Sequence, residues 1–103
     1  MPPILYLADQ VQDVRFDRES KAFLPAADVA DGPTFTIGAL TYFQAQEYLV
    51  DGIKPAEQVR IILRHGVRAI DGDPAAAAAF VERPRARLCN PLSLAIQDLT
   101  WGN

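Results

Sequence analysis

Apolar residues recur at three- and four-residue steps between Pro55 and Ile70, the longest segment of helical periodicity in the chain. Proline suits a first helical position because its missing N–H has no partner there. Asp-Gly pairs at 51–52 and 71–72 supply turn signals before and after the segment. The residues on one helical stripe are Val59, Ile62, Leu63, Gly66, Val67 and Ile70. The pattern therefore predicts one helix over residues 55–70.

The opposite face of this predicted helix carries a row of arginines. Arg60, Arg64 and Arg68 are four residues apart, and Ile61 lies beside them. Like charges at this spacing destabilise a helix by roughly 0.2–0.5 kcal/mol per pair. The row is either a solvated basic face or a docking strip for an acidic surface. That surface would belong to another chain or to another part of this one.

The first forty residues predict a small antiparallel sheet. Alternating or continuous apolar runs predict strands over residues 4–7, 11–16, 22–24 and 34–37. The second and third of these flank the polar residues 17–20 and form a hairpin that places Val14 and Phe16 on one face. Residues 25–33, with two prolines, two aspartates and a glycine, form a loop. This loop is a surface connection or a segment that orders on a partner.

A capping box opens the helical part of the chain. Thr41 and Gln44 have the spacing at which each side chain bonds the other's backbone N–H, which predicts a helix running to about Val50. Tyr42, Ala45, Tyr48 and Leu49 share one face of it, whereas Phe43 and Val50 lie on the other. A helix that is apolar on two sides is packed between layers or contacts a partner.

Two further helices are predicted by a capping side chain followed by proline. Asp73-Pro74 precedes a helix over residues 75–81, and Asn90-Pro91 precedes one from Pro91 to about Trp101. The main apolar stripe of the last helix consists of Leu92, Ala95, Ile96 and Leu99. Leu94 and Trp101 lie off that stripe, seven residues apart. Tryptophan is enriched at interface hot spots, so Trp101 is a candidate for binding a partner. The alternative is that it folds back over the core.

Together these elements predict an α+β fold and a single domain over residues 1–103. Residues 1–40 are expected to be mainly strands and loop, and residues 41–103 mainly helices. A small N-terminal antiparallel sheet would thus pack against three to four C-terminal helices. Half of the residues are apolar, which is enough for a modest core.

The net charge of −3 is divided unevenly. Residues 1–53 carry a net −5 and residues 54–103 a net +2, so that the halves could attract within the fold or between copies. An acidic chain is not expected to bind nucleic acid generally. Arg83, Arg85 and Arg87 form a local basic cluster, interpreted as a solvated linker or as a phosphate-binding loop.

No apolar run is long enough to span a membrane. The N-terminus lacks signal-peptide features, so a cytoplasmic location is expected.

Catalytic and metal-binding motifs are absent from the sequence. With one cysteine, Cys89, and one histidine, His65, the chain offers no internal disulfide and no multi-cysteine or multi-histidine metal site. It contains no glycine-rich phosphate loop, no G-x-S-x-G and no H-E-x-x-H. We therefore expect a non-enzymatic protein without cofactor or metal. Cys89 is expected to be a small buried side chain, and His65 to be exposed.

The order of these parts resembles the small tail assembly chaperones of long-tailed bacteriophages. Those proteins are similar in having an extended N-terminal region and then a phenylalanine-bearing strand that leads through Leu-Thr into helices. Here that junction is residues 35–41, FTIGALT, and the apolar helix after Asn90-Pro91 is similar in placement. The resemblance implies binding of tape measure and tail tube proteins before assembly. A small structural or connector protein of the virion has the same layout.

The favoured function is therefore non-catalytic protein–protein interaction in assembling or forming a phage particle. The expected partners are other proteins, which can include further copies of this chain, in the host cytoplasm or the virion. The expected contact residues are Arg60, Ile61, Arg64, Arg68, Leu94 and Trp101. The alternative is a small acidic regulator that binds one site on a larger host protein or nucleoprotein complex. Its active surface would contain Asp9, Asp13, Asp17 and Glu19, whose negative charges would block a nucleic-acid groove on that partner.

Overall fold

A β-hairpin begins the part of the chain, residues 10–102, that the computed structural model describes. Strands β1 (Val11–Asp17) and β2 (Ala22–Pro25) pair antiparallel, with Asp17 opposite Ala22. In the four-residue turn between them, Lys21 adopts a left-handed φ of 57° and its N–H donates to the Asp17 carbonyl. The predicted hairpin is therefore confirmed. The strand expected over residues 4–7 lies outside the described residues.

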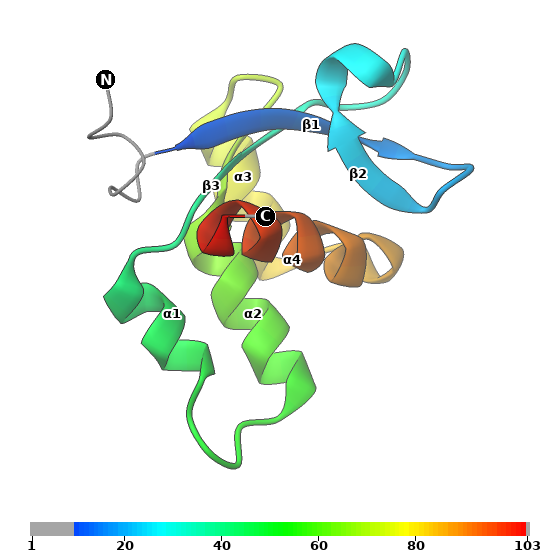
Figure 1. Cartoon of the computed structure of the whole chain (residues 1–103). Helices are drawn as coiled ribbons and strands as arrows, with labels where there is room; N and C mark the ends of the chain where they lie inside the picture. Colours follow the sequence, from blue (N-terminus) through cyan, green and yellow to red (C-terminus); the bar gives the residue numbers. More distant parts are fainter. Residues whose placement is uncertain (1–9, 103) are drawn as a thin grey trace.

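The sheet has four antiparallel strands in the order β2-β1-β3-β4 (Figure 1). The remaining elements follow the hairpin in the order η2 (Ala26–Asp28), β3 (Phe35–Gly38), α1 (Tyr42–Tyr48), α2 (Pro55–Gly66), β4 (Val67–Ile70), α3 (Pro74–Glu82) and α4 (Ala86–Trp101). Three strands come from the first forty residues and four helices from the rest. The predicted α+β class is confirmed, although the edge strand β4 lies in the half expected to be mainly helical.

The core lies between the sheet and the helices. A series of phenylalanine rings runs from the hairpin to α3, with centroid distances of 5.4 Å for Phe16–Phe23, 5.3 Å for Phe23–Phe35 and 5.2 Å for Phe35–Phe80. Edge-to-face and tilted pairs of this kind add to the stabilisation from burial. Beneath them Leu92 and Ile96 of α4 are fully buried. The predicted apolar stripe of the last helix therefore does face the core.

The loop over residues 25–33 is held against the sheet by Arg15. The Arg15 guanidinium donates from Nη1 to the carbonyls of Ala26 and Val29, at 3.3 and 2.8 Å, and from Nε to the Thr34 hydroxyl at 2.8 Å. Hydrogen bonds from a charged donor are stronger than neutral ones. The structure thus favours a surface connection anchored to β1 over a segment that orders on a partner.

The helix predicted over residues 55–70 ends early, and that boundary was wrong. After Gly66 the chain becomes β4, in which Ala69 pairs with Thr36 and Val67 with Ile37. Four residues are too few for periodicity to distinguish a helix from a strand. The backbone N–H and C=O groups of β3 need a partner, and β4 supplies them from thirty residues downstream. Asp71 and Gly72 form the turn after this strand.

The start of the last helix was also predicted wrongly. Helix α4 begins at Ala86, so Asn90 is not its N-cap and Pro91 lies inside it. Starting earlier lets Leu88 and Cys89 pack against the core. Both side chains are only partly buried, so each contributes less than the roughly 1.5–3 kcal/mol of a fully buried large apolar side chain. Together they offset part of the roughly 3 kcal/mol that an internal proline costs. The other predicted caps hold: Asp73 accepts from the Ala75 N–H, and Thr41 and Gln44 form a complete capping box.

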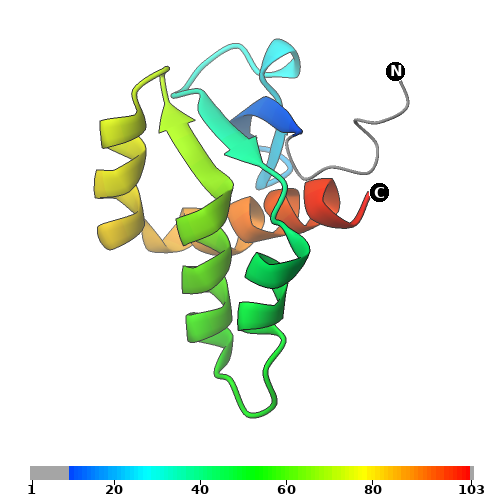
Figure 2. The ribbon, with the colours of Figure 1, turned by 90° about the vertical axis from the view of Figure 1, so that its left-hand side faces the viewer.

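Helices α1 and α2 extend away from the sheet as an antiparallel pair joined by residues 49–54 (Figure 2). In this view α3 and α1 lie on opposite sides of α2. The pair therefore presents two different flanks, one beside α3 and one formed by α1.

Candidate protein-contact surfaces

The predicted row of arginines with Ile61 does not form one exposed strip. Ile61 is only 8% exposed, because it belongs to the core cluster. Arg68 lies on β4 instead of α2. Its guanidinium lies over Gly38 and donates to the carbonyls of Ala39 and His65, both at 3.1 Å. The expectation that these two residues share an exposed helix face with Arg60 and Arg64 was therefore wrong.

Arg60 and Arg64 instead line a cavity of about 220 Å³ that we call the α2–α3 pocket. The pocket opens between α2, the end of α3 and the start of α4. Its lining residues are Ala56, Val59, Arg60, Leu63, Arg64, Val81, Glu82, Pro84 and Cys89. Most of these are apolar, and the charged groups are two arginines and one glutamate. Desolvation raises the pKa of the Cys89 thiol above its usual value, so Cys89 contributes to the lining as a neutral apolar group.

The surroundings of the α2–α3 pocket carry excess positive charge. Arg60 forms a 3.7 Å ion pair with Glu57, and both side chains are more than half exposed, so the pair contributes little. Among the described residues, the Arg64 side chain has no hydrogen bond or ion pair. Arg83 and Arg85, between α3 and α4, and Arg87, in the first turn of α4, are also exposed. Cationic groups next to an apolar cavity suit a partner that is apolar and acidic together.

Leu94 and Trp101 are both more than half exposed on α4. Their seven-residue spacing puts them on the same side of that helix. Trp101 was expected either to bind a partner or to fold back over the core, and its position is compatible with both. Its Nε1 donates to the Tyr48 hydroxyl at 3.0 Å, while 54% of the residue stays accessible. It therefore both fastens α4 to α1 and presents an aromatic face to solvent.

Exposed large apolar residues are concentrated in α1 and in the two residues that follow it. Seven large apolar residues are exposed in the described part of the chain, and four of them are within residues 42–50. We call these four, Tyr42, Phe43, Leu49 and Val50, the α1 surface. Phe43 is 79% exposed and stacks edge-to-face on Tyr42 at 5.5 Å. The sequence signalled this surface through a helix apolar on two sides, but it did not identify which side faces solvent.

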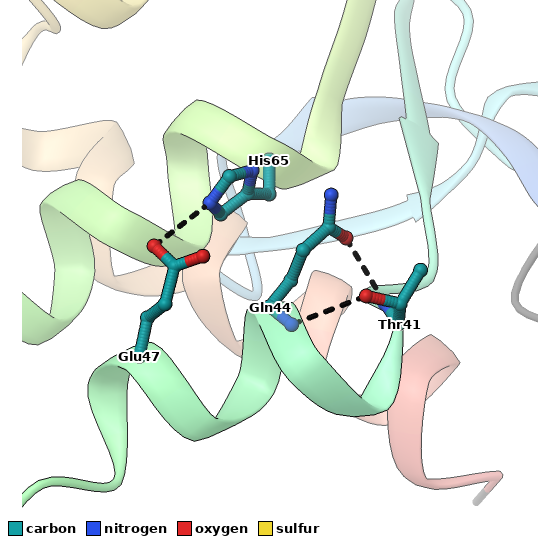
Figure 3. Close-up of polar contacts among 4 residues, drawn as sticks. All are labelled: Thr41, Gln44, Glu47 and His65. Carbon is teal, nitrogen blue, oxygen red and sulfur yellow. Dashed lines mark hydrogen bonds and ion pairs between the residues drawn. The ribbon is translucent and has the colours of Figure 1, made fainter.

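Polar contacts hold α1 in this position. Its first turn is closed by the capping box, in which Thr41 and Gln44 exchange bonds of 3.0 and 3.1 Å (Figure 3). Near its other end, Glu47 Oε1 lies 3.2 Å from Nε2 of His65 on α2 (Figure 3). His65 is thus partly covered and paired, which differs from the expected exposed histidine. The buried side of α1 consists of Ala45 and Tyr48.

Acids expected to form a regulator's surface make contacts within the chain. Asp13 accepts from the Thr36 hydroxyl at 2.6 Å. Asp17 accepts from the hydroxyl and backbone N–H of Ser20, and these bonds lower the pKa of its carboxyl. Glu19 is exposed in the hairpin turn, and Asp9 lies outside the described residues. A second cavity, of about 210 Å³, lies between the hairpin and the end of α4 and includes Gln10 and Asp98.

Within residues 10–102, no three His, Cys, Asp or Glu side chains are placed to hold a metal ion. None of the helices in that range is long and apolar enough to cross a membrane. Comparison with protein-family models, with curated proteins and with solved structures finds no match.

Proposed function

We propose that this protein is a non-catalytic protein-binding domain and that the α1 surface, together with Trp101, contacts its partner. The observation that carries the proposal is the concentration of exposed apolar residues in α1 and directly after it. Single exposed apolar residues are ordinary, but clustered ones mark interaction sites. Aromatic side chains contribute most, because each combines a large contact area with few rotatable bonds.

The proposed surface is presented by a rigid element. Helix α1 is capped at its start and packed through Ala45 and Tyr48, and its backbone is fixed before binding. Preorganisation of this kind lowers the entropy lost on association. Binding to a flat or grooved apolar partner therefore requires little rearrangement of this chain.

The narrower role that we propose is assembly of a phage tail, in the host cytoplasm or within the virion. Its support is the layout resemblance centred on residues 35–41, in which strand β3 leads through Leu40 and Thr41 into α1. The partners would then be the tape measure and tail tube proteins. Shielding the apolar segments of such proteins before assembly requires an exposed apolar surface and no catalysis.

The test is binding of the immobilised protein to the tape measure protein from the same source, compared with Phe43→Ser. We expect Phe43→Ser to weaken binding at least about tenfold, because a central aromatic contact is worth about 2 kcal/mol or more. Trp101→Ala should also weaken binding while the chain stays folded. The matched control is Val11→Ser, which changes an apolar residue on β1 that is 57% exposed. Equal binding by wild type and Phe43→Ser would overturn the role of the α1 surface.

A further inference from the structure

We propose that copies of this chain associate head to tail, with the α1–α2 turn of one copy inserted into the α2–α3 pocket of the next. The α1–α2 turn comprises residues 49–54. This inference rests on the proposed function, protein binding, and names a second copy as one partner. It uses Leu49 and Val50, the part of the α1 surface that follows the helix, whereas Tyr42 and Phe43 at the start of the helix are left for a different protein.

The pocket side of the contact combines apolar side chains with two arginines. Val59, Leu63 and Val81 contribute apolar lining, and the cavity of about 220 Å³ is large enough for an aliphatic side chain. Arg64 is part of this lining, and its side chain makes no hydrogen bond or ion pair within residues 10–102. An incoming carboxylate would therefore meet a guanidinium that is not already paired. Glu82 also lines the pocket, and its negative charge opposes a carboxylate that binds close to it.

The α1–α2 turn has the complementary chemistry. Leu49 and Val50 are exposed on consecutive positions and Asp51 follows them directly. Asp51 has no hydrogen bond or ion pair among the described residues. One exposed aliphatic side chain could fill the pocket while the adjacent carboxylate reaches Arg64. Of the other charges near the turn, Glu47 is already paired with His65, and Lys54 lies at its opposite end.

The two contact regions occupy different parts of the α1–α2 pair. The turn lies at the tip of the pair, away from the sheet (Figure 2), whereas the pocket lies between α2 and the end of α3. A copy that uses its turn to bind one neighbour therefore keeps its pocket free for another. A head-to-tail contact joins two different surfaces of the same chain, and it therefore generates closed rings or open chains. A two-fold dimer, in contrast, pairs the same surface of both copies.

The contact is small and should be weak. A turn of a few residues buries less than the roughly 1,600 Å² of a standard interface. Association should therefore appear only at high protein concentration. The ionic part is partly exposed and should weaken with salt, since the screening length falls from about 10 Å at 0.1 M to about 3 Å at 1 M.

The experiment is sedimentation velocity and light scattering of the purified chain from about 10 µM to about 1 mM, a range that covers weak contacts. The wild type should rise above its monomer mass of 11.3 kDa with concentration. Asp51→Arg and Arg64→Glu should each stay monomeric, which corresponds to at least about tenfold weaker association. An equimolar mixture of the two variants should associate again, because the unaltered turn of Arg64→Glu fits the unaltered pocket of Asp51→Arg.

The matched control is Asp31→Arg, which makes the same charge change at an exposed position in another loop. It should associate as the wild type does. Circular dichroism verifies that each exposed-site variant is folded. A wild type that is monomeric at the highest concentration would overturn the inference, as would single variants that still associate or a mixture that stays monomeric. The proposed function is tested separately, because Phe43→Ser should weaken binding to the tape measure protein whether or not the chain self-associates.

Discussion

Gly66 is the residue at which α2 ends and β4 begins, and its missing side chain lets α4 approach. A Cβ at this position would lie 2.5 Å from Cδ1 and 2.6 Å from Cγ2 of Ile96. Ile96 is fully buried, so it has little room to move away. The glycine is thus required by packing and does not act as a helix terminator in the left-handed conformation.

We predict that Gly66→Ala destabilises the fold. Alanine in place of a helical glycine gains up to about 1 kcal/mol in propensity, but overpacking a core costs about 1–3 kcal/mol. Urea unfolding should show a net loss. In an Ile96→Ala background the clashing atoms are gone, so the same Gly66→Ala change should become neutral or stabilising. A stabilising effect of Gly66→Ala in the wild-type background would contradict the packing argument.

At the scale of single elements, the sequence predicted correctly those turns and helix caps that depend on neighbouring residues. The hairpin, the capping box at Thr41 and the Asp73 cap all depend on residues within a few positions of one another, and all are confirmed. The wrong predictions concern residues whose secondary structure or burial depends on contacts with distant parts of the chain. Val67 becomes part of a strand because β3 is available to pair with it. Ile61 is buried because the core extends to a second side of α2.

The candidate site was predictable only in part for the same reason. That Arg60 and Arg64 share a helix face follows from their spacing, but the apolar pocket beside them requires α3 and α4. The stripe of α4 placed Leu94 and Trp101 off the core-facing side, but it left open whether Trp101 is exposed or folds back over the core. No local pattern indicates that Trp101 reaches Tyr48, which is 53 residues away. Nor did periodicity show which side of α1 faces solvent.

Pro91 gives a prediction about α4 as an element. The proline cannot donate to the Arg87 carbonyl one turn earlier, and its ring crowds that carbonyl. Because the helix starts at Ala86 regardless, Pro91→Ala should stabilise the protein, by about 1–3 kcal/mol. The measurement is the urea midpoint at unchanged m-value. If Pro91 instead marks the true helix start, the substitution would have little effect and the amides of residues 86–90 would exchange rapidly.

At the scale of the whole molecule, α1 depends on attachments to distant parts of the chain. Seven residues are too few for a helix to persist alone in water. Burial of Ala45 and Tyr48 supplies part of its stability. The Gln58 side chain donates to the Tyr48 carbonyl at 3.1 Å, and Trp101 donates to the Tyr48 hydroxyl at 3.0 Å. The C-terminal end of α4 thereby controls how often α1 detaches.

We therefore predict that Trp101→Phe loosens α1 specifically. Phenylalanine keeps an aromatic ring but removes the N–H donor, and one hydrogen bond is worth about 0.5–1.5 kcal/mol. Hydrogen exchange of the α1 amides should accelerate about two- to tenfold, while β1, β3 and α3 keep their rates. Leu94→Ala, on the same side of α4, should leave α1 unchanged. Uniform acceleration would show that Trp101 supports the core instead. Acceleration confined to α1 would mean that the hydrogen bond to Tyr48 controls how long the proposed contact surface stays formed.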